Sequence, residues 1–241
     1  MRLRDVIPWG RSFSEYERMF GLGKQDLSGK ILGCGDGPAS FNAEATERNV
    51  SVISCDPIYA FSAAQIEAQI RSSYDTVIEQ VRQNQNGFVW REFRDPDDLG
   101  QHRLRAMRRF LDDFEIGKQT GRYVTASLPQ LPFENGQFSL ALVSHLLFLY
   151  SQLFSIDDHR RAIEELLRVA NEVRIFPLLT LDRQWSQHVE PVVDHFQRQG
   201  MKIEIRAVNY EFQKTDDHLG NRMLIVQREW PDVRSQAKDS R

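Results

Sequence analysis

The chain has 241 residues, of which 41% are hydrophobic and 27% are charged, an ordinary composition for one large globular domain. The 31 basic and 34 acidic residues give a net charge of −3, which does not favour nucleic acid or an anionic membrane as a partner. Two cysteines exclude a disulfide-rich scaffold and a four-thiolate zinc site. No apolar run could span a bilayer and the first residues lack a signal-peptide core, so we expect a cytoplasmic protein.

Residues 1–28 are expected to form an irregular N-terminal segment, because prolines and glycines interrupt any long element. One short helix is predicted over residues 14–20. The aromatic and basic side chains of this segment could fold over a ligand as a lid, or could anchor the segment to the core. These side chains are Trp9, Arg11, Tyr16 and Phe20.

A strand, a glycine-rich turn, a helix and a second strand follow. The strand over residues 30–33 runs into the sequence GCGDGP, the helix covers 39–47, and the next strand covers 50–55 and ends at Asp56. This order predicts a parallel pair of strands joined by a right-handed crossover.

A helical insert is predicted over residues 61–121. Apolar residues at spacings of three and four give each of its two helices one inner face. The arginines of the second helix fall largely on the opposite side, so we interpret them as a solvated face rather than an anion site. The inner residues are Ile66, Ile70, Tyr74, Val77 and Val81, then Leu104, Met107, Leu111 and Phe114; the arginines are Arg103, Arg105, Arg108 and Arg109.

The second half of the chain predicts five more strands and two helices. One helix starts at Asp157 and the other stops before Gly200. No helix separates the last two strands, so they are expected to pair antiparallel in an otherwise open α/β sheet. The strands cover residues 123–126, 138–144, 173–176, 201–208 and 223–228.

The glycine turn and the acid after the second strand point to one ligand class. Open α/β sheets bind ligands outside the carboxyl ends of their strands. Gly33, Gly35 and Gly37 allow positive φ and close approach of a ligand to the backbone. Asp56, 19 residues after Gly37, can accept hydrogen bonds from two ribose hydroxyls. Together they predict an adenosine-containing cofactor; the alternative is a tight turn with Asp56 capping a loop.

The spacing of the turn also bears on which cofactor it holds. A dinucleotide fingerprint needs a small residue three positions after its second glycine, and Pro38 stands there. This departure argues against NAD or FAD.

The chain resembles the class I S-adenosylmethionine-dependent methyltransferases. Residues 31–37 (ILGCGDG) are similar to the first motif of that family and residues 52–56 (VISCD) to its second. Residues 127–133 (SLPQLPF) and the strand 138–143 resemble its adenine-side loop and fourth strand, and the likeness covers about residues 29–228. The opening PWGRS and residues 35–42 resemble an uncharacterised bacterial branch.

This resemblance implies a Rossmann-like three-layer α/β sandwich. Its sheet would be mostly parallel and seven-stranded, with a terminal antiparallel hairpin and a helical insert. We expect one methyltransferase-like domain over residues 1–230, with 1–28 as the lid segment, and a flexible tail over 231–241.

The resemblance also implies the residues that bind S-adenosyl-L-methionine. The three glycines would approach its methionine part, Asp56 would hold the ribose, and Pro57 and Ile58 would lie beside the adenine. Ser127 stands where many relatives carry an aspartate near the adenine amino group. The implied cofactor-binding residues are Gly33, Cys34, Gly35, Asp36, Gly37, Asp56, Pro57, Ile58, Ser127, Leu128 and Ser144.

His145 is the candidate catalytic residue, because it follows the fourth strand at the cofactor edge. An imidazole with a pKa near its reference value can take a proton at neutral pH, although His145 could simply hydrogen-bond a loop. Tyr150 could line the same mouth or pack in the core. The sequence around His145 lacks the loop of enzymes that methylate exocyclic base nitrogens, and neither cysteine is placed as a nucleophile.

The methyl acceptor is expected to be a small molecule rather than nucleic acid, and the insert is expected to cap it. The insert aromatics Tyr74, Phe88, Trp90 and Phe93 indicate an organic acceptor or a protein contact. No metal is expected, because the spacing of residues such as His188 and His218 fits no defined site. A non-catalytic binding module and a nicotinamide oxidoreductase remain alternatives, and the oligomeric state stays open.

Overall fold

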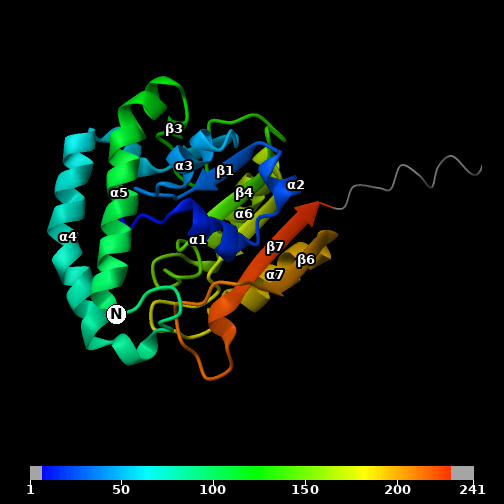
Figure 1. Cartoon of the computed structure of the whole chain (residues 1–241). Helices are drawn as coiled ribbons and strands as arrows, with labels where there is room; N and C mark the ends of the chain where they lie inside the picture. Colours follow the sequence, from blue (N-terminus) through cyan, green and yellow to red (C-terminus); the bar gives the residue numbers. More distant parts are fainter. Residues whose placement is uncertain (1–6, 229–241) are drawn as a thin grey trace, which may run out of the picture.

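A seven-stranded sheet forms the centre of the molecule. The computed structural model describes residues 7–228, so the tail expected over 231–241 lies outside the described residues. The strand order is β3-β2-β1-β4-β5-β7-β6, in which β7 runs antiparallel to both of its neighbours and the other pairs are parallel. The long arrows of β6 and β7 lie side by side at one edge of the molecule (Figure 1). The strands are β1 (Ile31–Cys34), β2 (Val52–Cys55), β3 (Tyr123–Val124), β4 (Phe138–Ser144), β5 (Ala170–Phe176), β6 (Met201–Ala207) and β7 (Arg222–Arg228).

Helices cover both faces of this sheet, which confirms the predicted Rossmann-like three-layer sandwich with its terminal antiparallel hairpin and helical insert. Helices α6 and α7 pack on one face, and α1 and α3 pack on the other. None of the described helices combines the length and apolar character that crossing a membrane requires. The helices are α1 (Phe13–Phe20), α2 (Lys24–Leu27), α3 (Phe41–Glu47), α4 (Ala63–Gln83), α5 (Pro96–Gln119), α6 (Ile156–Val169) and α7 (Val189–Arg198).

Strand β4 shows why the sheet is buried on both faces. Its alternate side chains point to opposite sides, as the two-residue period of a strand requires. Leu140 and Leu142 pack with α1 and α3, whereas Ala141 and Val143 pack with α6 and α7. The continuous apolar run predicted for a doubly covered parallel strand is therefore confirmed.

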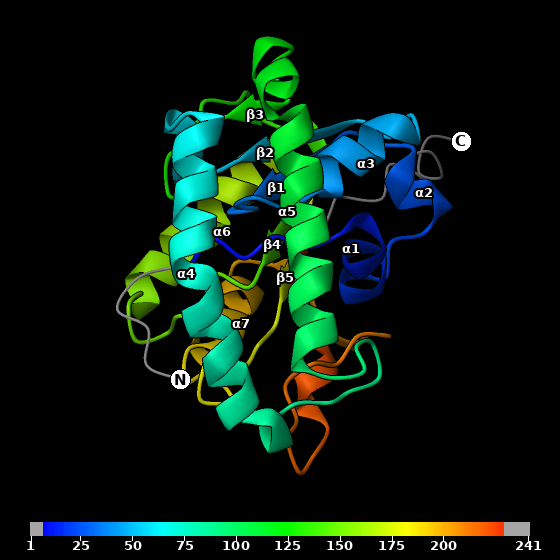
Figure 2. The same ribbon diagram turned by 60° about the vertical axis from the view of Figure 1, so that its left-hand side comes forward.

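The insert forms a pair of long helices that stand side by side along one flank of the molecule (Figure 2). Ser62 and Gln65 form the expected capping box at the start of α4. The predicted inner face of α5 is only partly right, because Leu104 and Leu111 are half-buried while Phe110 is fully buried.

Arg103 corrects the interpretation of the α5 arginines as a solvated face. Its side chain is 1% exposed, and its guanidinium forms an ion pair of 2.7 Å with Glu15 of α1. The reason is helical spacing: Arg103 lies four residues before Met107 and seven before Phe110, so it falls on the same buried face of α5 and not opposite it. Arg105 and Arg108 are exposed as expected.

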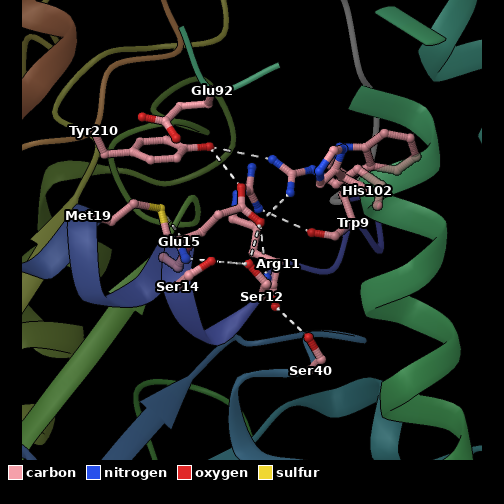
Figure 3. Close-up of polar contacts among 12 residues, drawn as sticks. Trp9, Arg11, Ser12, Ser14, Glu15, Met19, Ser40, Glu92, His102 and Tyr210 are labelled. Atoms are coloured by element: carbon pink, nitrogen blue, oxygen red, sulfur yellow. Dashed lines mark hydrogen bonds and ion pairs between the residues drawn. The ribbon is translucent and has the colours of Figure 1, made fainter. Parts of the chain in front are cut away.

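Glu15 lies at the centre of a buried polar cluster (Figure 3). It accepts hydrogen bonds from Arg103, from the Tyr210 hydroxyl at 3.0 Å and from the Ser12 backbone N–H at 3.0 Å. Burial alone would raise the pKa of Glu15, but the charges of Arg103 and Arg11 outweigh it and hold the pKa below its ordinary value. The cluster thus joins the N-terminal segment, the insert and the loop between β6 and β7.

We expect Arg103→Met to lower the free energy of unfolding by about 3–5 kcal/mol, because the change leaves the Glu15 carboxylate buried without its counter-charge. Urea denaturation measures the loss. Glu15→Gln combined with Arg103→Met should recover part of it. Arg105→Met, an exposed position on the same helix, is the control and should change stability by less than about 0.5 kcal/mol. Equal effects of Arg103→Met and Arg105→Met would contradict this account of the ion pair.

Candidate functional site

A cavity of about 410 Å³ opens at the carboxyl ends of β1, β2 and β4. Strand order reverses between β1 and β4, which is where open α/β sheets bind ligands. Its volume lies within the range of small-molecule sites. Eleven residues predicted for the site line this cavity, namely Cys34, Gly35, Asp36, Gly37, Asp56, Pro57, Ile58, Ser127, Leu128, Ser144 and His145.

Gly33 is the predicted site residue that does not line the cavity. A Cβ at this position would collide with the carboxylate of Asp36. That carboxylate is buried and accepts hydrogen bonds from the Tyr16 hydroxyl at 2.7 Å and from the Ser54 hydroxyl at 2.6 Å. Gly33 therefore makes room for an internal carboxyl group.

The next two glycines shape the cavity itself. Gly35 has φ +71°, and a Cβ there would lie 2.6 Å from a methyl carbon of Leu146. Gly37 has φ +55°, and a Cβ there would meet no atom within 4 Å, so the turn leaves open space beside it. Both positions need the left-handed conformation that glycine adopts without strain.

Asp56 ties this glycine turn to the segment after β2. One carboxylate oxygen accepts from the backbone N–H of Gly37 at 2.8 Å, and the other accepts from Ile58 at 2.9 Å. Burial raises the pKa of Asp56, and these two backbone donors oppose that rise. Asp56 does cap a short helical turn, as the alternative interpretation held, and it also lines the cavity. Each oxygen keeps a further lone pair for a ligand hydroxyl.

His145 occupies a constrained position just after β4. Its φ is +54°, its backbone N–H donates to the Phe176 carbonyl at 2.6 Å, and its ring nitrogen Nδ1 lies 2.9 Å from the Ser144 hydroxyl. Burial, and then the charges of Arg11 and Arg103, lower its pKa well below the reference value assumed from the sequence. The imidazole is therefore neutral at pH 7.

A second cavity of about 380 Å³ adjoins the first. Ile7, Trp9, Arg11 and His145 line both cavities and form the wall between them. The remaining lining comes from the insert, from the loops after β4 and β5 and from the segment before β7. Tyr150 lines this second cavity and is also 5% exposed, so both interpretations of it hold in part.

The four N-terminal residues considered for a lid differ in their surroundings. Trp9 and Arg11 line the cavities. Tyr16 stacks on Phe41 with ring centroids 4.2 Å apart, and Phe20 is fully buried with it. The helix α1 is thus anchored in the core, although its Tyr16 also lines the first cavity. Opening of the part before α1 as a lid stays a prediction.

Leu181, Phe212 and Gln213 line the second cavity, but sequence reasoning did not single them out. They lie in loops without a periodic pattern or a motif. Phe88 of the insert stacks on Phe212 with ring centroids 4.6 Å apart, so the insert reaches the far end of the chain. The aromatic residues of the insert were the one sequence signal for this cavity, but the sequence did not indicate which residues they pack against.

One curated protein matches the chain along nearly its whole length. It is the uncharacterised protein MJ0045 of Methanocaldococcus jannaschii, 33% identical over 229 residues, which are 95% of this chain and 99% of that protein. The chain belongs to the same family as this archaeal protein. No family model matches the chain. The predicted bacterial branch stays a prediction.

Solved structures that match the fold include several methyltransferases. A TehB-like S-adenosylmethionine-dependent methyltransferase of Corynebacterium glutamicum is 12% identical, with 93% of this chain and 89% of that chain covered and a TM-score of 0.45. Magnesium protoporphyrin IX methyltransferase of Synechocystis, crystallised with bound S-adenosylmethionine, is 12% identical, with 90% and 91% covered and a TM-score of 0.41. Likeness at this level concerns the fold and assigns no residue a role.

The buried Asp36 carboxyl predicts a pH dependence of stability. Burial, against the hydrogen bonds from Ser54 and Tyr16, raises its pKa to about 7. Between the unfolded pKa near 4 and pH 7, the unfolded chain releases this proton while the folded chain retains it, so stability falls as pH rises.

Asp36→Asn mimics the protonated acid and should remove this dependence. We expect the wild type to lose roughly 2 kcal/mol more stability than the variant between pH 5 and pH 7.5. Urea denaturation at both pH values measures it, and other titrating groups cancel in the comparison. Parallel stability profiles of the two proteins would show that Asp36 titrates normally.

Proposed function

We propose that this protein is an S-adenosylmethionine-dependent methyltransferase that acts on a small organic acceptor. The observation that carries the proposal is the pair of adjoining cavities, one bordered by the glycine turn and Asp56, the other separated from it by the wall around His145. Such a pair provides room for a nucleoside cofactor and, next to it, for the molecule that it modifies.

The lining of the first cavity suits this cofactor along its length. Asp56 has lone pairs left to accept from two ribose hydroxyls. Pro57 and Ile58 on one side and Leu128 on the other offer apolar contact to an adenine ring. The open space at Gly37 and the close approach at Gly35 leave the backbone accessible to the methionine part.

When bound, the cofactor supplies an activated methyl group: an acceptor lone pair bonds to the methyl carbon while the carbon–sulfur bond breaks, and sulfur keeps that electron pair, which leaves S-adenosylhomocysteine. The chain contributes mainly by positioning. His145 faces both cavities, and its neutral imidazole can accept a hydrogen bond from a protonated acceptor. The Ser144 hydroxyl beside Nδ1 orients that ring.

Asp56→Asn should weaken binding of S-adenosylhomocysteine at least tenfold, because a charge-assisted hydrogen bond is lost. Isothermal calorimetry gives the affinity, and thermal unfolding checks that the variant folds. Asp75→Asn on the exposed side of α4 is the matched control and should bind as the wild type does.

A ligand-side comparison tests the same contact without relying on the variant alone. Wild type should bind adenosine at least tenfold more tightly than 2′,3′-dideoxyadenosine, and Asp56→Asn should reduce that ratio. Equal binding of the two nucleosides by the wild type would remove the ribose role of Asp56. Binding of NADH in preference to S-adenosylhomocysteine would contradict the methyltransferase proposal and favour a nicotinamide oxidoreductase.

A further inference from the structure

The second cavity combines apolar walls with an excess of positive charge. Three arginines line it, and Asp182 is the one acidic residue among its described lining residues. Asp182 is exposed and lies 3.5 Å from the Gln152 side chain. Most of the remaining lining is hydrophobic and includes Val77, Val81, Phe88, Leu149, Leu181 and Phe212.

The three arginines differ in how far their charge is already neutralised. Arg103 is paired with Glu15. Arg11, in contrast, donates from Nη1 to the Trp9 carbonyl at 3.1 Å, and no carboxylate lies within 4.0 Å of it in the part of the chain that the structure describes. Its Nε is buried and has no hydrogen-bond partner there. Arg183 lines the cavity beside Gly87 and has no ion pair within residues 7–228.

A guanidinium without an ion-pair partner at a largely apolar wall costs folding free energy unless a ligand supplies a counter-charge and hydrogen-bond acceptors. Burial and the neighbouring charge of Arg103 lower the pKa of Arg11, and the nearby Glu15 carboxylate opposes that change only in part. A carboxylate or sulfonate would supply both the counter-charge and the acceptors that a guanidinium fork takes in pairs.

We propose that the second cavity binds a small organic anion with an apolar body, held by Arg11 with Arg183 beside it. Because Arg11 and His145 line both cavities, the anion lies next to the first cavity, and it is the methyl acceptor if the proposed function holds. The side-chain carbonyl oxygens of Gln80 and Gln213 are buried and lack hydrogen-bond partners in the described chain. They could accept hydrogen bonds from a hydroxyl or amine on the same molecule.

Two fluorescent dyes of the same skeleton test this proposal on the full chain. 8-Anilino-1-naphthalenesulfonate carries a sulfonate, and N-phenyl-1-naphthylamine is its uncharged counterpart. We expect wild type to bind the sulfonate at least tenfold more tightly, with one site per chain. Arg11→Met should abolish that preference and leave binding of the neutral dye unchanged, and Arg183→Met should reduce it. Arg105→Met, which removes an exposed arginine outside the cavity, should keep the preference.

Calorimetry with S-adenosylhomocysteine on the same variants separates the two proposals. If wild type prefers the anionic dye but does not bind S-adenosylhomocysteine, the anion site stands and the methyltransferase assignment fails. If wild type binds both dyes equally, the anion site is wrong. If Arg11→Met weakens S-adenosylhomocysteine tenfold and leaves the dye preference intact, Arg11 serves the cofactor and the inference is overturned. Should Arg11→Met fail to fold, the wild-type dye ratio and Arg183→Met decide the question.

Discussion

The buried ion pair between Glu15 and Arg103 is the interaction on which the site depends. It connects residues 88 positions apart in the sequence and brings the N-terminal helix against the insert. Tyr210 adds the segment between β6 and β7 to the same cluster. Each of these three parts supplies lining to the second cavity, so the cavity exists only where they meet.

Polar groups in this protein are buried mainly where parts of the chain must be held together. Asp36 joins Tyr16 of α1 to Ser54 of β2, and Asp56 joins the two turns that border the first cavity. Replacing all members of a buried polar cluster together by apolar residues can leave stability unchanged or even raise it, so the value of such a cluster lies in fixing one arrangement of the walls. The sheet provides the hydrophobic core, while these carboxylates position the elements around the ligand space.

Much of the fold could be predicted because its signals are local. The apolar run of β4, the Ser62–Gln65 capping box and the glycine turn each depend on residues close together in sequence, and the structure has all three. Eleven residues that line the first cavity could be predicted for the same reason, whereas lining residues such as Phe154, Asp158 and Ala162 were not singled out. The ion pair of Arg103 could not: its spacing from Met107 and Phe110 indicates a buried position, but its partner Glu15 lies in another helix. The depressed pKa of His145 likewise depends on Arg11 and Arg103, which only the tertiary fold brings near it.

The wall shared by the two cavities has a thermodynamic consequence. Trp9, Arg11 and His145 have one face toward each space, so an arrangement of these side chains that suits one ligand alters the surface presented to the other. Linkage then requires that the first ligand changes the binding free energy of the second by the same amount as the second changes that of the first. Affinities measured with one space empty therefore describe a different equilibrium from those of the ternary complex, and the order in which the two molecules enter leaves the total unchanged.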